Sequence, residues 1–168
     1  MGAFRSTFVA MKPRPPKRPL GRRELVDLPA FGLQGVEAKV DTGAYTSALH
    51  CTDIRVEAGP GGRPVLHGRL FDPAQPGFDG QDLSFAEFAL RDIRSSNGEV
   101  QERYVIEAAV QLYGEEFWVE FSLSDRSDMK YPVLLGRSLL RQGRFVVDVA
   151  KRNLSHKASG RAAARQAE

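Results

Sequence analysis

The feature that most constrains the fold is a series of short stretches in which apolar and polar residues alternate, separated by turn residues. The clearest two run from Tyr104 to Leu112 and from Phe117 to Leu123, with Tyr113 to Glu116 as the turn. In the second stretch Phe, Val, Phe and Leu alternate with Trp, Glu and Ser, which is the period of a strand with one buried face. The two stretches therefore predict a β-hairpin.

Similar stretches recur from Glu24 to Val149, and helical periodicity is nearly absent. The segment 132–136 predicts a short buried strand, and 137–142 predicts one or two helical turns that end at Gly143. Many short strands at close spacing favour a β-barrel or sandwich. A chain of 168 residues is long enough for one domain with a hydrophobic core.

The charged residues divide the chain into three parts. Residues 1–23 hold seven Lys or Arg and no acid, and 151–168 hold five against one glutamate, which leaves 12 basic and 20 acidic residues in 24–150. We therefore expect a disordered, basic, proline-rich tail over 1–23, a folded domain over 24–150 and a flexible basic tail over 151–168. The tails are either solvated or in contact with RNA or an anionic surface. Basic and aromatic residues are not interleaved in the way that is typical of specific nucleic-acid recognition, so we expect none.

The expected cellular location rests on three features that the sequence lacks: a membrane-spanning stretch, a secretory signal and a pair of cysteines. No stretch approaches the roughly 20 apolar residues of a membrane-spanning helix, so we expect no membrane contact. The first twenty residues contain no apolar block of the kind found in secretory signals. The single cysteine, Cys51, excludes a disulfide within the chain and fits a reducing compartment. We therefore expect a cytoplasmic protein.

The most informative motif is Asp41-Thr42-Gly43, followed by Ala44, where an apolar strand runs into a tight turn. Gly43 lets the backbone bend and approach closely, and Thr42 offers a hydroxyl that can hold the turn. Alone, this triplet is common enough to be an ordinary strand-ending turn. Its interpretation therefore depends on a second segment, Val133 to Leu140.

Together the two segments resemble the retroviral proteases (retropepsins), in which Asp-Thr-Gly-Ala opens the catalytic turn. In that family a strand ending in Gly, followed by Arg-x-Leu-Leu, runs beneath the turn. The chain is more similar still to a bacterial retropepsin-like family that carries the name ATP-dependent zinc protease and is associated with RimK ATP-grasp glutamate ligases. The resemblance covers about 24–149. The matching segments are 39–44, 46–50, Arg94 with Ser95, Ser96 and Gly98, 102–103, 123–129 and 131–137.

The resemblance implies a mostly-β, closed acid-protease (retropepsin-like) barrel with one short C-terminal helix. It also implies that the chain is an aspartic endopeptidase with Asp41, Thr42 and Gly43 as its catalytic turn. Acid proteolysis uses two carboxyl groups about 3 Å apart that share one proton. Because the chain has one such turn, the second Asp41 must come from a second copy, so we expect a homodimer that hydrolyses a peptide or protein substrate.

The resemblance also implies residues that surround the turn. A flap is expected over Ile93 to Val100, where Asn-Gly is a strong signal for a tight hairpin, although an ordinary exposed hairpin would look the same. Arg137 is either a support of the turn or a surface charge. The implied substrate-contacting residues are Ala44, Ser95, Ser96, Asn97 and Gly98, and the implied supporting residues are Leu135, Gly136, Arg137 and Arg126.

The zinc and ATP of the family name find little support in this sequence. The three histidines and Cys51 are too scattered to predict a zinc site, and no Gly-rich phosphate-binding loop is present, so we expect no metal and no other cofactor. Cys51 is expected to be a buried apolar residue rather than a nucleophile. The alternative function is a non-catalytic retropepsin-fold module that binds a peptide or glutamylated tail beside an ATP-grasp (RimK-like) glutamate ligase.

Overall fold

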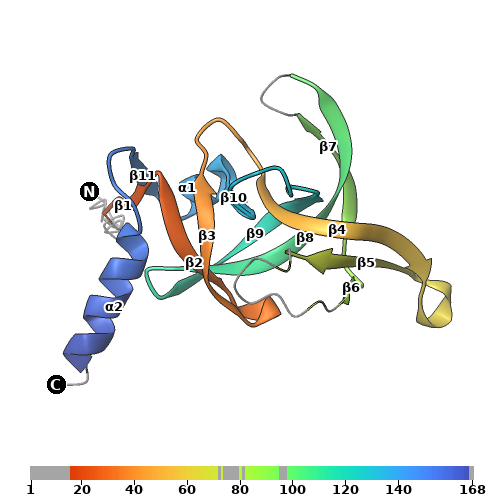
Figure 1. Ribbon diagram of the computed structural model, residues 1–168, viewed down its shortest axis with the longest axis horizontal. Coiled ribbons are helices and arrows are strands. Elements are labelled where there is room, and N and C mark those ends of the chain that lie inside the picture. Colours follow the sequence, from red (N-terminus) through yellow and green to blue (C-terminus); the bar gives the residue numbers. More distant parts are fainter. Residues whose placement is uncertain (1–15, 72, 74–79, 81, 95–97, 167–168) are drawn as a thin grey trace, which may run out of the picture.

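The computed structural model describes residues 16–71, 73, 80, 82–94 and 98–166, and it is mostly β (Figure 1). This confirms the predicted fold class at the level of its secondary structure. The strands are β1 (Arg18–Gly21), β2 (Arg23–Leu28), β3 (Leu33–Val40), β4 (Ser47–Ala58), β5 (Pro64–Leu70), β6 (Asp82–Phe85), β7 (Ala89–Arg94), β8 (Val100–Leu112), β9 (Glu115–Ser124), β10 (Val133–Leu135) and β11 (Phe145–Asp148). The helices are α1 (Arg137–Gln142) and α2 (Leu154–Gln166), with 3-10 turns η1 (Pro29–Phe31) and η2 (Pro60–Gly62).

The strands form one large sheet and one small sheet. The order in the large sheet is β10-β3-β2-β8-β9-β4-β5-β6, and β10 also pairs with β4. The pairings therefore return to their first strand and form a ring. Outside this ring, β5 pairs with the long strand β4, β6 pairs with β5, and β7 pairs with β8 (Figure 1). The small sheet is the parallel pair of β1 and β11.

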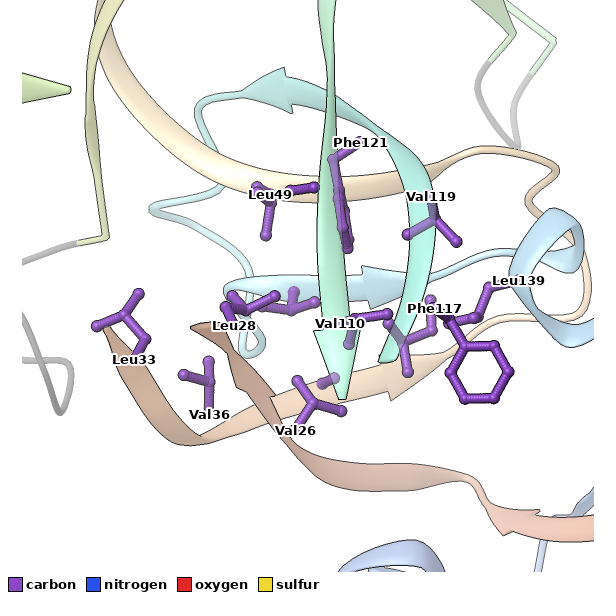
Figure 2. Packing of buried hydrophobic residues seen from close by; sticks show 14 of the residues in the cluster. Val26, Leu28, Leu33, Val36, Leu49, Val110, Phe117, Val119, Phe121 and Leu139 are labelled. Atoms are coloured by element: carbon purple, nitrogen blue, oxygen red, sulfur yellow. The ribbon is translucent and has the colours of Figure 1, made fainter. Parts of the chain in front are cut away.

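The hydrophobic core is formed mainly by side chains from the strands of the ring, and side chains from β1, β5, α1 and β11 add to it (Figure 2). Alternation decides which ones: along β9, Phe117, Val119 and Phe121 are buried, whereas Trp118 is 57% exposed. The predicted hairpin is thus confirmed. Its turn is shorter than expected, because Tyr113 and Gly114 both have positive φ and Leu112 pairs directly with Glu115. Two left-handed turn residues match the right-handed twist of the flanking strands.

The predicted short strand and helix near the C-terminal end are also present. They are β10 and α1, and α1 ends at Gly143 as the sequence indicates. A Cβ at position 143 would lie 2.0 Å from the ring of Phe145, so only glycine fits there. The C-terminal end of α1 is therefore fixed by packing.

The two ends of the domain differ from the expected boundaries. β1 begins at Arg18, inside the expected N-terminal tail, and α2 occupies 154–166, where we expect a flexible tail and no second helix. The reason is Glu24, which is fully buried and accepts hydrogen bonds from the N–H groups of Gly21 (2.6 Å), Leu154 (3.0 Å) and Ser155 (3.1 Å).

Within the described residues, neither helix is long and apolar enough to cross a membrane.

Candidate active site

The Asp41 turn is held against the segment that joins β10 to α1. Val40 at the end of β3 lies in parallel register with Leu135 of β10. Directly after this pair, the N–H of Asp41 donates to the Leu135 carbonyl (2.9 Å), and the N–H of Arg137 donates to the Ala44 carbonyl (2.8 Å). Backbone hydrogen bonds on both sides therefore fix the position of the turn.

Gly136 sits directly beneath the turn, and its lack of a side chain is what permits this packing. A Cβ there would lie 2.6 Å from the Tyr45 carbonyl oxygen and 2.7 Å from the Thr46 carbonyl carbon. Its N–H donates to the hydroxyl of Ser47 (3.0 Å), which is fully buried. Ser47 was not among the predicted site residues, and the only signal for it was its place in the matching segment 46–50.

The carboxylate of Asp41 is partly exposed and has different surroundings on its two oxygens. Oδ1 accepts hydrogen bonds from the N–H groups of Gly43 (2.9 Å) and Ala44 (3.2 Å). Oδ2 lies 3.4 Å from the ammonium of Lys39, and the side chain keeps 26% of its surface exposed. Burial raises the pKa of Asp41, but the Gly43 hydrogen bond, the Lys39 charge and the Ala44 hydrogen bond together outweigh it, so the pKa is lowered.

The tip of the turn faces away from the core. Thr42 and Gly43 are exposed, whereas Ala44 is half-buried. In one chain, then, the turn presents an ionised carboxylate and an adjacent threonine at an accessible surface. Such a carboxylate can accept a proton from water, and a partner group that donates a proton must come from elsewhere.

Positive charge gathers near this carboxylate. Arg126 is half-buried, and its Nε donates to the Tyr131 carbonyl (3.3 Å). Burial and then the charge of Arg103 lower the pKa of Arg126, while the charge of Asp41 opposes that change, so Arg126 interacts with each of these two groups. Arg103 is held by the Gln101 side chain (3.0 Å). Lys39 and Arg126 are therefore the cations that interact with Asp41.

The structure describes only some of the other predicted site residues. Ser95, Ser96 and Asn97 lie outside the described residues. Gly98 has φ of 88° in the connection between β7 and β8, where Arg94 pairs with Val100. Among the residues that the structure describes, the exposed side chain of Arg137 forms no ion pair, so its contribution to the turn is its backbone N–H.

The histidines and Cys51 do not form a zinc site. His50 is buried and its Nδ1 accepts the N–H of Arg126 (2.7 Å), so that nitrogen is already used. Burial, and secondarily the charge of Asp53, raises the pKa of Cys51 to about 12, which keeps the thiol protonated. In the described part of the chain, no three His, Cys, Asp or Glu side chains are grouped to hold a metal ion. The donor set thus does not fit zinc.

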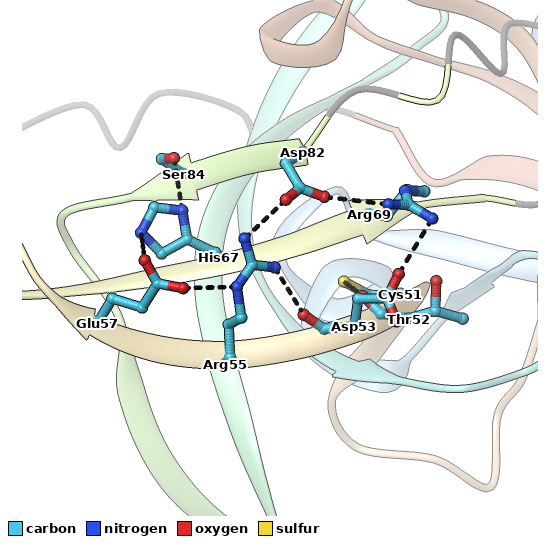
Figure 3. Close-up of polar contacts among 9 residues, drawn as sticks. All are labelled: Cys51, Thr52, Asp53, Arg55, Glu57, His67, Arg69, Asp82 and Ser84. Carbon is cyan, nitrogen blue, oxygen red and sulfur yellow. Dashed lines mark hydrogen bonds and ion pairs between the residues drawn. The ribbon is translucent and has the colours of Figure 1, made fainter.

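His67 belongs to a different polar cluster, on strands β4, β5 and β6 (Figure 3). Its Nδ1 lies 2.9 Å from the Ser84 hydroxyl and its Nε2 lies 3.9 Å from the Glu57 carboxylate. In the same cluster Arg55 bridges Glu57 and Asp82, each at 2.7 Å. These contacts join neighbouring strands on the exposed part of the sheet, where such pairs contribute little to stability.

Comparison with solved structures supports the fold. A crystal structure of a Legionella pneumophila protein of unknown function (DUF785) is similar with a TM-score of 0.60 and 25% sequence identity. The match covers 82% of this chain and 97% of that one. Nearly the whole of that protein therefore has a counterpart here.

The curated relatives are named probable alpha-L-glutamate ligases. One from Shewanella halifaxensis is 35% identical over 121 residues, and one from Parasynechococcus marenigrum is 35% identical over 133 residues. The matches cover 72% and 77% of this chain but only 26% and 27% of those proteins. The chain thus spans about a quarter of the length of the curated relatives it matches.

A family model assigns the chain more directly. The model described as retropepsin-like aspartic endopeptidase RimB matches residues 19–158, which include both the Asp41 turn and the β10–α1 segment beneath it. The match extends beyond the domain boundaries expected from sequence and takes in β1 and the start of α2. The chain therefore belongs to the RimB-like family of retropepsin-like proteins.

Proposed function

We propose that two copies of this chain pair through their Asp41 turns and hydrolyse peptide bonds with the two Asp41 carboxyl groups. The observation that carries the proposal is the geometry of the turn. It holds one partly exposed carboxylate in fixed position, with Oδ1 bound by two N–H groups. The ring of strand pairings, which a closed acid-protease barrel requires, supports the same assignment.

The pair of carboxyl groups would supply both halves of the proton transfer. Within one chain the pKa of Asp41 is lowered, so a lone copy provides only the ionised form. When a second Asp41 carboxylate approaches, like-charge repulsion raises one pKa and the two groups retain one shared proton. The ionised member then takes a proton from water, and the protonated member donates to the carbonyl oxygen of the peptide.

The exposed threonine at the tip is suited to hold the pair together. Thr42 lies beside Asp41 and is exposed in the single chain, so its hydroxyl is available to the partner turn. In an isologous interface the same residue faces its own copy across the two-fold axis. We therefore assign Thr42 and Gly43 to the contact between turns and Asp41 to the chemistry.

The charges around the turn favour an acidic substrate. Lys39 pairs with Asp41, Arg126 interacts with Asp41, and Arg103 interacts with Arg126, so peptide carboxylates would find cations on their approach. The curated relatives are named glutamate ligases, which fits a peptide rich in glutamate. We propose that the substrate is a glutamate-rich peptide or protein tail, and that a glutamate ligase is the functional partner.

The second candidate function is a module that binds such a tail without cleaving it. It is favoured by one specific observation: a single chain contributes one carboxylate, and one carboxylate does not complete the dyad. The two functions differ in assembly. The enzyme needs a dimer that brings the Asp41 side chains together, whereas the binding module works as a monomer.

The deciding experiment measures hydrolysis of a glutamate-rich peptide together with the mass of the protein in solution. Asp41→Asn should reduce the rate at least about 100-fold, because the dyad loses its acid–base function. In an equal mixture with exchanging subunits, the wild-type chains should retain about one half of their activity, since half of them pair with an inactive partner. Asp128→Asn is the matched control, because Asp128 is an exposed aspartate that the mechanism does not use.

Two results would contradict the enzymatic function. One is full activity of the Asp41→Asn variant. The other is a wild-type rate that stays proportional to protein concentration under conditions where only monomer is present. A monomer that binds the peptide without cleaving it would establish the binding module instead.

A further inference from the structure

A pocket of about 520 Å³ lies at the corner where α2 begins, and it shares no residue with the Asp41 turn. Its lining residues are Arg22, Ala150, Lys151, Arg152, Leu154 and Lys157. Four of these six side chains are cationic, and the other two are apolar. The volume is within the roughly 300–1,000 Å³ typical of small-molecule sites.

The backbone that carries these side chains is rigidly placed. The N–H of Arg22 donates to the Lys151 carbonyl (2.9 Å). A Cβ on Gly21 would lie 2.5 Å from both the Lys151 carbonyl oxygen and the Arg152 Cα, so the 151–152 backbone packs directly on the glycine. The cations are thus gathered by the fold, although Arg22 and Lys157 are far apart in the sequence.

The start of α2 is not the binding element. The N–H groups of Leu154 and Ser155 already donate to the buried carboxylate of Glu24. The positive character of the pocket therefore comes from its side chains. This separates the pocket from a simple helix terminus.

Three of the four cations have no acidic partner within the described residues. Lys151 pairs with Asp148 at 3.2 Å, and that carboxylate also accepts the N–H of Ala150. Arg22, Arg152 and Lys157 form no ion pair in this part of the chain, and all three are exposed. Three unpaired positive charges that line one hollow favour the binding of an anion there.

We propose that this pocket binds a small molecule that carries two or more linked phosphate groups. Guanidinium groups match phosphate oxygens in pairs, and a multiply charged anion can contact several of the three unpaired cations at once. A single carboxylate would leave most of the charge unbalanced. Ala150 and Leu154 offer an apolar wall for an uncharged part of the ligand.

Calorimetric titration of the full chain with inorganic tripolyphosphate tests the proposal. Wild-type protein should bind tripolyphosphate more tightly than orthophosphate or hexaglutamate. The double variant Arg152→Gln/Lys157→Gln should bind at least about tenfold more weakly, since it loses two charge-assisted contacts. A matched control, Arg63→Gln/Arg141→Gln, removes the same charge at exposed positions outside the pocket and should leave binding unchanged.

A rise in melting temperature with added tripolyphosphate gives a second readout, because a ligand that binds only the folded state stabilises it. This rise should be present in the control pair and reduced in the pocket pair. The proposal would be overturned if wild-type protein did not bind tripolyphosphate, or if the pocket variant and the control variant weakened binding equally. It would also be overturned if hexaglutamate or a short RNA bound more tightly than tripolyphosphate. None of these results depends on peptidase activity.

Discussion

Two carboxylates in this protein both accept hydrogen bonds from backbone N–H groups, but one is fully buried and the other is partly exposed. Glu24 and Asp41 each accept hydrogen bonds from backbone N–H groups near a turn. Glu24 is fully buried and uses both oxygens on three N–H groups, two of them at the start of α2. Asp41 uses one oxygen on its own turn and leaves the other beside Lys39 and partly exposed.

The difference separates a structural carboxylate from one that is available for chemistry. Burial of the Glu24 carboxyl group is tolerated because both oxygens accept hydrogen bonds, and its removal leaves two buried N–H groups and one partly buried N–H group without this acceptor. At Asp41 the backbone fixes the direction of the side chain and leaves one oxygen accessible. Similar hydrogen bonds thus hold the tertiary structure together in one place and orient a partly exposed carboxylate in the other.

The largest effect on stability is expected at Glu24. Glu24→Ala should lower the free energy of unfolding by about 3 kcal/mol or more, because three N–H groups lose a charged acceptor. Urea denaturation measures this loss. Glu37→Ala is the control: this carboxylate pairs with Arg23 at the surface, and its removal should cost less than about 1 kcal/mol. Equal losses in the two variants would remove the distinction between buried and exposed carboxylates.

A smaller loss is expected beneath the Asp41 turn. Gly136→Ala places a Cβ against the backbone of Tyr45 and Thr46, and overpacking of this kind costs about 2 kcal/mol. Because the turn must shift, peptide hydrolysis should fall as well. Gly160→Ala is the matched control, since its Cβ meets nothing within 4 Å, and it should be neutral or slightly stabilising. A fully active and stable Gly136→Ala variant would show that the turn does not depend on this packing.

Lys39 should control the protonation of Asp41. Lys39→Met removes the ammonium 3.4 Å from Oδ2, so the pKa of Asp41 should rise. The carboxylate then ionises at a higher pH, and the acid limb of the pH–rate profile should move to higher pH. NMR titration of the Asp41 carboxyl carbon follows the same change without turnover. Lys17→Met, at an exposed position outside the turn, should leave both measurements unchanged.

The smallest effect on stability is expected from Asp41→Asn, below about 1 kcal/mol at neutral pH. The amide oxygen can still accept from Gly43 and Ala44, and only the partly exposed Lys39 pair is lost. Because the pKa of Asp41 is lowered on folding, its charge stabilises the protein above its unfolded pKa. That contribution disappears as the pH falls through the lowered value. Wild type and variant should therefore converge in acid, and a larger difference there than at neutral pH would contradict this assignment.

Much of the ring of strands could be predicted because its signals are local. Alternation along β8 and β9 indicated a hairpin, and the Gly143 stop indicated the end of α1. The length of the β8–β9 turn was wrong, because nothing in the sequence of Tyr113 to Glu116 distinguishes a two-residue turn from a longer one. The Asp41 turn is predicted as the catalytic turn from its motif and the resemblance that the motif supports, and its catalytic role stays a prediction.

The features that sequence reasoning missed depend on residues far apart in the chain. The α2 segment has weak amphipathic character and was expected to be flexible, and its first N–H groups are capped by Glu24, 130 residues earlier. Ser47 binds Gly136 across 89 residues, and its hydroxyl is ordinary in sequence. No local pattern reports such contacts.

The sequence by itself determined the alternation of the strands, the position of the acidic turn and the glycine beneath it, because side-chain period and backbone freedom are local properties. Only the tertiary structure decided which carboxylate is buried, which one remains accessible, and which cations gather at the corner of α2. The burial of a side chain and its distance from other charges depend on which distant segments pack together. These contacts form only when the chain folds.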